Sequence, residues 1–381
     1  MPRGGDVKVS VRNKCSDFKS YRAARVKSLF NVGSGADFSI DADLPIGEDG
    51  WRIGVIVGPS GSGKTSLGRK VFGDGAMYDP SWPTDAPIVD AIAPGGDFDA
   101  VTGALASVGL GSVPSWLRPY GVLSNGEKFR ANLARLVSEA PSRAVVDEFT
   151  SVVDRQIAKI GALAFQKAWR RTAGQVVLLS CHYDILEWLE PDWVFDTATG
   201  KFAGRGLQRP RIDLDIWQTD WRYWNLFEPH HYLKAPKMIA ATCYVGAVAG
   251  EPVAHIGVST RPGLKEARAC RMVVMPEWQG AGVGMRFLNA VCELWLQGQN
   301  RFGLKLNTLF HTSHPGLCAA LRRDPKWRQV SASMFGDDKA KSRASIARSG
   351  NSNAGAGYGG HLRAVQGFRY YGQAGADARK K

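Results

Sequence analysis

A glycine-rich run near the N-terminus has the residue types and spacing of a phosphate-binding loop. Residues 58–65, Gly-Pro-Ser-Gly-Ser-Gly-Lys-Thr, match GxxxxGK[ST] in full, between a β-branched strand pattern and a helical pattern. The glycines let successive backbone N–H groups point at the β- and γ-phosphates of a nucleotide. Lys64 can reach the same oxygens, and the Thr65 hydroxyl is a ligand for Mg²⁺. The predicted phosphate contacts are Gly58, Ser60, Gly61, Ser62, Gly63, Lys64, Thr65 and Ser66.

A second run supplies two carboxylates at the end of a short apolar strand pattern. Residues 144–148 read Ala-Val-Val-Asp-Glu, and a later apolar pattern, 176–180, leads to His182. We expect Asp147, together with Thr65, to hold Mg²⁺, and Glu148 to polarise the attacking water as a general base. A lone V-V-D-E run could end any strand. After a phosphate loop, and followed by His182, it favours ATP hydrolysis.

The order of these motifs resembles that of the ABC-type ATPases. Leu123-Ser-Asn-Gly-Glu127 is similar to their LSGGQ signature, residues 151–154 resemble the D-loop, and residues 180–182 resemble the switch-histidine segment. The resemblance implies that His182 is the catalytic switch residue. It also implies that Ser124 and the N–H of Gly126 contact the γ-phosphate of ATP held by a second protomer, at a helix N-terminus. ATP would then drive formation of a homodimer.

Three departures from the family pattern argue against a transporter. Asn125 and Glu127 stand where Gly and Gln are usual in the signature, and residues 72–122 contain no glutamine for a Q-loop. Lys64 and Ser124 are only 60 residues apart in the sequence. We therefore expect a truncated form of the helical subdomain that grips membrane domains in transporters.

A second glycine-rich run lies in the C-terminal part of the chain. Residues 271–284 read as a strand, a glycine loop and the start of a helix, and they resemble the Q/RxxGxG/A acyl-CoA site of the GNAT superfamily. Backbone N–H groups and the helix N-terminus would hold the pyrophosphate of coenzyme A, and the strand would pair with its pantetheine arm. A tight turn needed for packing explains the glycines equally well, but a preceding hairpin and following strands favour the acyl-CoA interpretation. The predicted acyl-CoA contacts are Met272, Val273, Val274, Gln279, Gly280, Gly282 and Gly284.

Acyl transfer by a GNAT enzyme needs a base for the acceptor amine and an acid for the leaving thiolate. Each histidine could instead be a cap or a packed polar residue. The pair His311 and His314 is the preferred choice for the base, and Tyr370 for the acid. The other candidates are His230, His231 and Tyr371.

The patterns around these motifs predict two α/β domains. Strands and helices alternate through residues 51–200, which is typical of a parallel sheet covered by helices. The predicted divisions are an ABC-type ATP-binding domain at 1–200, a linker at 201–216, a GNAT-like α+β domain with a central mixed sheet at 217–372, and a basic tail at 373–381.

Charge and cysteine usage suggest partners and a compartment. The net charge is +14, and residues 322–381 carry 13 Lys/Arg against 4 Asp/Glu, a net +9. Such a basic end suggests nucleic acid, with DNA favoured over RNA, although a solvated tail would look the same. Six cysteines without CxxC spacing, and no apolar run long enough for a bilayer, predict a protein of the cytoplasm without a membrane part, the host cytoplasm if a phage encodes it.

Three functions fit these features. The first is an ATP-gated N-acyltransferase acting on nucleic acid. This function agrees with a looser likeness to the phage Mom-type acyltransferases that modify DNA bases, which is carried by residues 224–233, residues 311–315 and Trp327. The second is an ABC-type nucleic-acid clamp whose GNAT fold only binds a ligand. The third is an ATP-regulated acetyltransferase of proteins or small molecules. The predicted cofactors are ATP, Mg²⁺ and acetyl-CoA or another acyl-CoA.

Overall fold

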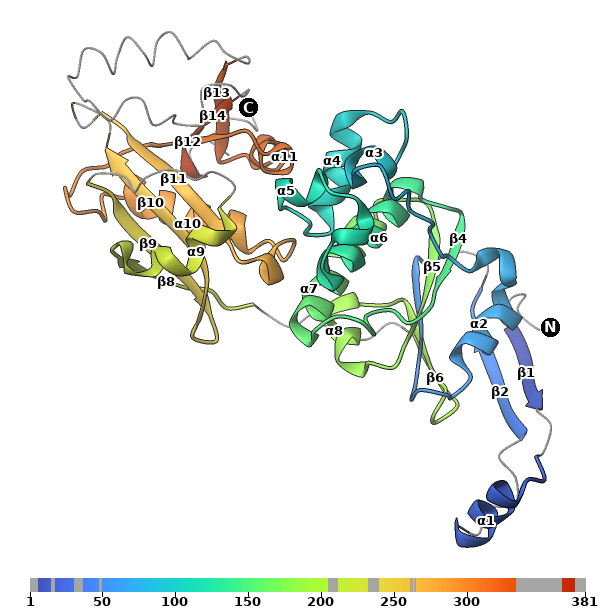
Figure 1. Cartoon of the computed structure of the whole chain (residues 1–381). Coiled ribbons are helices and arrows are strands. Elements are labelled where there is room, and N and C mark those ends of the chain that lie inside the picture. The colour runs from blue at the N-terminus through green and yellow to red at the C-terminus, as the bar shows by residue number, and fades with distance from the viewer. Residues whose placement is uncertain are drawn as a thin grey trace. The chain divides into compact units, whose positions relative to one another are not determined.

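The computed structural model of the chain divides into two compact units that the sequence order does not separate cleanly (Figure 1). It describes residues 6–14, 18–30, 37–47, 50–204, 212–231, 240–260, 263, 265–333 and 365–373. The first unit comprises residues 1–83 and 124–210, and the second comprises 84–123 and 211–381. Among the described residues, no helix is both long and apolar enough to cross a bilayer.

The first unit is built on a five-stranded sheet with the order β4-β5-β3-β6-β7. Four strands are parallel and β7 is antiparallel to β6, which confirms the predicted parallel α/β arrangement. β3 lies in the middle and all of its residues are buried, as expected for an apolar strand covered on both faces. The strands are β3 (Ile53–Val57), β4 (Arg143–Val146), β5 (Gln175–Ser180), β6 (Trp193–Asp196) and β7 (Lys201–Gly204), and the helices are α2 (Lys64–Phe72), α6 (Asn125–Glu139), α7 (Arg155–Trp169) and α8 (Leu186–Leu189).

An antiparallel hairpin completes the first unit. β1 (Asp6–Lys14) pairs with β2 (Asp37–Pro45), and α1 (Tyr21–Phe30) lies between them in the chain. Alternate residues of β2 are buried and share a core with Ile56 of β3 and Leu67 of α2. The hairpin therefore packs on the elements that carry the phosphate loop.

The second unit contains a seven-stranded mixed sheet with the order β13-β14-β12-β11-β10-β9-β8. β11 and β12 are parallel and the other neighbours are antiparallel, so the predicted mixed sheet is confirmed. The elements are β8 (Asp215–Thr219), α9 (Trp224–Phe227), β9 (Thr242–Val248), β10 (Glu251–Thr260), β11 (Ala267–Val274), α10 (Val283–Leu296), β12 (Thr308–Thr312), α11 (Pro315–Arg323), β13 (Trp327–Ser333) and β14 (Val365–Tyr370).

The two faces of this sheet are covered by different helices. Trp295 of α10 donates a hydrogen bond to the Tyr244 hydroxyl of β9, and Phe287 packs beside Gly246. On β10, His255 packs instead against Trp224 of α9. Because successive side chains of a strand point to opposite faces, α9 and α10 lie on opposite sides of the sheet.

Residues 84–123 group with the second unit, although they lie inside the predicted ATP-binding domain. This segment, which we call the insert, contains α3 (Ile88–Ala91), α4 (Phe98–Ser107) and α5 (Val113–Trp116). α4 packs on α11, and Figure 1 shows the two side by side. An added Cβ on Gly316 of α11 would lie 2.5 Å from the Ala106 Cβ, so the glycine permits this close approach.

The predicted linker, 201–216, begins and ends in strands. β7 belongs to the first sheet, and β8 opens the second. Residues 205–211, the basic segment 334–364 and residues 374–381 of the predicted tail lie outside the described residues.

Candidate functional site

The predicted phosphate loop connects the central strand β3 to α2. Gly61 and Gly63 adopt φ values of 77° and 80°, which are unfavourable for other residues, and Gly63 is the N-cap of α2. The Lys64 ammonium donates hydrogen bonds to the carbonyl oxygens of Gly58 (2.8 Å) and Pro59 (2.7 Å). The lysine therefore folds back over the loop. Its contact with phosphate oxygens stays a prediction.

The two predicted Mg²⁺ ligands are in direct contact. The Thr65 hydroxyl donates a hydrogen bond of 2.9 Å to the Asp147 carboxylate. Thr65 lies in the first turn of α2, and Asp147 directly follows β4. A hydroxyl and a carboxylate facing each other are oxygen donors of the kind that Mg²⁺ prefers.

Glu148 has a backbone conformation that costs energy. Its φ is 49°, and that of Thr150 is 70°, in the left-handed region. The Glu148 N–H donates a hydrogen bond of 2.9 Å to the Asp147 carboxylate oxygen that Thr65 does not contact. The Glu148 side chain is exposed, and its role as a general base stays a prediction.

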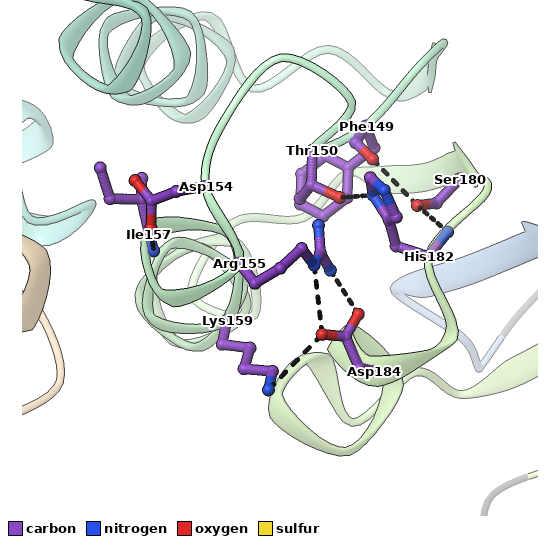
Figure 2. A network of polar contacts seen from close by, with 9 residues as sticks. All are labelled: Phe149, Thr150, Asp154, Arg155, Ile157, Lys159, Ser180, His182 and Asp184. Carbon is purple, nitrogen blue, oxygen red and sulfur yellow. Dashed lines mark hydrogen bonds and ion pairs between the residues drawn. The ribbon is translucent and has the colours of Figure 1, made fainter.

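His182 is fixed at the end of β5 by a polar network (Figure 2). Its Nδ1 lies 3.1 Å from the Thr150 hydroxyl, and its N–H donates to Ser180 Oγ at 3.1 Å. Ser180 in turn donates to the Phe149 carbonyl at 2.9 Å. Residues from β5 and from the turn after Glu148 thus hold each other in place.

Charged residues surround His182 in the same view. Arg155 forms an ion pair with Asp184, which Lys159 also contacts at 3.5 Å. Burial, and then the Arg155 guanidinium, lower the pKa of His182. A neutral imidazole is therefore the dominant form at neutral pH.

The signature segment begins α6 with a reciprocal capping box. Ser124 is the N-cap and accepts from the Glu127 N–H at 3.3 Å, while the Glu127 carboxylate accepts from the Ser124 N–H at 2.9 Å. An added Cβ on Gly126 would lie 2.8 Å from Ile157 Cδ1 of α7. Because its carboxylate closes the capping box, Glu127 has a structural role in this chain, at the position where glutamine is usual.

In the second unit, the strand before the glycine loop is irregular. The register of β11 against β10 shifts between His255 and Gly257, and Arg271 in this bulge has a φ of 56°. β11 pairs with β12 only as far as Ala269 and Phe310, although β11 continues to Val274. The two parallel strands therefore part beyond this point, where a ligand's arm could pair with β11.

The glycine loop joins β11 to α10 through a short helical turn, η7 (Pro276–Trp278). Gly280 and Gly282 have φ values of 91° and 84°, and Gly282 is the N-cap of α10. An added Cβ on Gly284 would lie 3.2 Å from both the Met272 and Val274 side chains, so glycine allows α10 to lie close to β11. Val273 points to the other face, in the aromatic cluster with Trp224.

The comparisons with known proteins assign both halves. The model of the acetyltransferase (GNAT) family matches residues 212–308. The cytochrome c biogenesis ATP-binding export protein CcmA of Rhodospirillum rubrum is 32% identical over 164 residues, which cover 34% of this chain and 68% of that protein. The chain is an ABC-type ATPase fused to a GNAT domain.

Solved structures give a weaker likeness to the ATPase half. A dimeric ATP-binding cassette in a post-hydrolysis state with ADP and Pi has a TM-score of 0.36 and 13% identity, over 52% of this chain and all of that one. A dimeric bacterial ABC transporter cassette has a TM-score of 0.34 and 12% identity, over 50% of this chain and 94% of that one. The assignment of the N-terminal half to the ABC-type ATPases therefore rests on the 32% identity to CcmA.

The predicted histidines of the GNAT domain lie in different places. His314 is the N-cap of α11: its Nδ1 accepts from the Leu317 N–H at 3.3 Å, and its Nε2 lies 3.1 Å from the Gly111 carbonyl of the insert. Both ring nitrogens are thus engaged in one neutral tautomer, and burial lowers the pKa of His314. His230 is exposed, and His231 is buried against Trp224.

His311 lies in β12, one residue beyond the last pair with β11. The neighbouring Phe310 packs with Trp327, whose indole donates to Asn289 of α10. By strand alternation His311 faces the opposite side of the sheet, the side that carries α9.

Tyr370 is buried on β14 and points toward α10. Its hydroxyl donates to Glu293 at 2.8 Å, and burial, then Glu293, raise the pKa of Tyr370 well above its usual value. Glu293 lies ten residues after Val283, so about 15 Å of helix separates Tyr370 from the glycine loop. The Tyr371 hydroxyl accepts instead from Arg369 at 3.4 Å. The roles of these residues in acyl transfer stay predictions.

One buried histidine of the GNAT domain was not among the site residues predicted from the sequence. His255 is completely buried among the rings of Trp221, Trp224 and Phe227, with centroids 5.7, 5.2 and 5.5 Å away. Its ring nitrogens meet no partner at hydrogen-bonding geometry among the described residues. Burial lowers the pKa of His255 to about 4, against a smaller opposite effect of the Arg271 backbone. Its apolar strand surroundings gave no signal in the sequence.

Proposed function

We propose that the chain hydrolyses ATP in its ABC-type half and transfers an acyl group from acyl-CoA to an amine in its GNAT domain. The contact between Thr65 and Asp147 carries the first part, because it brings two oxygen donors for Mg²⁺ beside the phosphate loop. Mg²⁺, when bound there, would neutralise phosphate charge. Lys64 would bind the phosphates, and Glu148 would accept a proton from the attacking water.

Acyl transfer is supported by two features of the GNAT domain. The strands β11 and β12 part, and two glycines with positive φ follow β11. The backbone of Met272, Val273 and Val274 would pair with the pantetheine arm, and the amides around Gly280 and Gly282 would bind the pyrophosphate. An acyl-CoA in this position supplies an activated thioester. The bulge at Arg271 would place its carbonyl close to the strand opening.

We assign the base to His311, because it lies at the strand opening and faces the side opposite α10. The amine nitrogen of the acceptor attacks the thioester carbonyl, its proton passes to His311 Nε2 or Nδ1, and the C–S bond breaks to release the thiolate, which takes up a proton. Tyr370 keeps its proton at neutral pH, since the pKa of its hydroxyl is raised, but that hydroxyl is held by Glu293. We propose Tyr370 as the acid that protonates the leaving thiolate.

We further propose nucleic acid, and DNA before RNA, as the acceptor, in a dimer closed by ATP. The support is the net +9 of residues 322–381. An acceptor that is a protein or a small amine would leave this charge without a role. The five described cysteines are free, which suits the cytoplasm.

The experiment is a transfer assay with labelled acetyl-CoA, DNA, RNA and mixed amines as acceptors, followed by mass spectrometry of the bases. Gly282→Val should abolish acetyl-CoA binding, because a β-branched residue is strained at a φ of 84°. Gly303→Val, at a φ of 65° in a surface turn, is the matched control. Transfer to DNA that persists in Gly282→Val would refute the acyl-CoA site.

A further inference from the structure

The insert contacts the glycine loop of the GNAT domain through hydrogen bonds between identified atoms. The N–H of Gly111 donates a hydrogen bond of 3.1 Å to Oε1 of Gln279. The Nε2 of the same glutamine side chain donates to the Val274 carbonyl at 3.0 Å. Gln279 thus links the end of β11 to a loop that comes from the ATPase half of the sequence.

The contact is tight on both sides of Gln279. An added Cβ on Gly109 would lie 2.2 Å from the Gln279 carbonyl oxygen, and one on Gly111 would lie 2.7 Å from Gln279 Oε1. His314 of α11 adds a hydrogen bond to the Gly111 carbonyl and a ring contact with Trp116, with centroids 5.5 Å apart. We call residues 108–112 the docking loop.

The docking loop is held firmly within the insert. Val108 and Leu110 are buried, and Trp116, itself buried, donates from its indole to the Leu110 carbonyl at 2.7 Å. The loop therefore cannot change position without moving the insert's own core. It behaves as a rigid support for Gln279.

The insert ends directly at the signature. Leu123, its last residue, precedes Ser124, the N-cap of α6 and the residue expected to contact ATP across the dimer. Eleven residues separate Gly111 from Leu123 and include α5 and the turn η2 (Tyr120–Val122). The chain itself therefore joins the insert to α6, with η2 ending only two residues before Ser124.

We propose that the docking loop is part of the acyl-CoA site, with Gly111 and His314 as positioning residues for Gln279, and that through it ATP and acyl-CoA bind cooperatively. This inference rests on the proposed function of the glycine loop. The docked loop keeps Gln279 tied to Val274. It also lies against the start of the glycine loop, where a Cβ on Gly109 would be 3.4 Å from the Gly280 nitrogen. Reciprocity requires that acyl-CoA strengthen ATP binding by the same factor.

The test is calorimetric titration of acetyl-CoA into the full chain carrying Glu148→Gln, without and with saturating Mg²⁺-ATP. We expect ATP to tighten acetyl-CoA binding about 5- to 10-fold. Gly111→Ala, which meets Gln279 without backbone strain, should weaken acetyl-CoA about 10-fold and remove the effect of ATP. Gly103→Ala is the control, because a Cβ there meets nothing.

A second pair covers the case in which Gly111→Ala folds poorly. Gly109→Ala and Gly95→Ala have similar φ values of 84° and 73°, but only at Gly109 would the Cβ meet Gln279. If both docking-loop variants bind acetyl-CoA as tightly as the wild type, the inference is overturned. It is also overturned if ATP leaves acetyl-CoA binding unchanged. In both cases the proposed function still stands. No acetyl-CoA binding to the wild-type chain would instead refute the proposed function and the inference with it.

Discussion

Thr65 and Asp147 are joined by a hydrogen bond of 2.9 Å, although they are 82 positions apart in the sequence. The contact exists because α2 starts where β3 ends, while β4 ends at the same edge of the parallel sheet. The carboxyl ends of parallel strands are where ligands of open α/β sheets bind.

Replacing Thr65 with valine keeps the shape of the side chain and removes its hydroxyl. We expect Mg²⁺-dependent ATP hydrolysis to fall about 100-fold or more, since a metal ligand is lost. Thr172→Val is the control, because it removes a hydroxyl that donates to a backbone carbonyl, that of Trp169, and not to a predicted metal ligand. Steady-state phosphate release over a range of Mg²⁺ measures both variants, and equal rates would contradict the metal role.

Glu148→Gln should separate ATP binding from hydrolysis. Without the carboxylate, hydrolysis should fall about 100- to 10,000-fold, while ATP binding and ATP-dependent dimerisation persist. Glu187→Gln, an exposed acidic residue of α8, serves as the control. Light scattering after size exclusion reports the dimer, and a monomer with ATP bound would count against closure across the signature.

The ATPase motifs could be predicted from the sequence because each is a short run whose spacing the chemistry dictates. The glycine loop, Lys64 and Thr65 follow one another within 58–65, and the structure places this run between β3 and α2, in the predicted order of strand, loop and helix. Phosphate binding by these residues stays a prediction. The place of residues 84–123 could not be predicted, because it depends on the fit of Gly109 and Gly316 to surfaces far away in the sequence. Glycines in such contacts look the same in sequence as glycines in turns.

The two histidines of the preferred pair should respond differently to mutation. His311→Gln should lower kcat for acetyl transfer about 100-fold and leave the KM for acetyl-CoA unchanged. His314→Gln should raise that KM and lower stability by about 1–2 kcal/mol, since a helix cap and the bond to Gly111 are lost. Release of the CoA thiol measures the kinetics. A kcat defect in His314→Gln alone would reverse the assignment.

His255 predicts how stability depends on pH. Its pKa is about 4 in the folded chain, below the ordinary 6.5, so the unfolded chain binds the proton more readily. Stability from this residue is therefore fully present above pH 6.5 and decreases as the pH falls toward 4, by up to about 3 kcal/mol. His255→Phe, which suits the aromatic surroundings, should flatten this part of the profile.

Urea denaturation between pH 7 and 4.5 measures the effect of His255, with His230→Phe as the exposed control. The difference between His255→Phe and wild type should grow as the pH falls. A constant difference across this range would mean that His255 is not buried in its neutral form.

Short motifs predicted the glycine loop of the GNAT domain but not the partners of its side chains. Gln279 was predicted as a ligand contact, whereas in the fold its amide bridges Val274 and Gly111. His255 escaped prediction because an isolated histidine within an apolar strand pattern carries no spacing signal. Both depend on which strand faces which helix, and that is set by packing across the sheet.

The most direct test of the account is the rate of ATP hydrolysis with and without acetyl-CoA and with and without DNA or RNA, with Glu148→Gln as the blank. The account predicts hydrolysis in the wild-type chain that acetyl-CoA changes several-fold, with a further response to DNA. A rate no higher than that of Glu148→Gln, or one that neither acetyl-CoA nor nucleic acid changes, would contradict it.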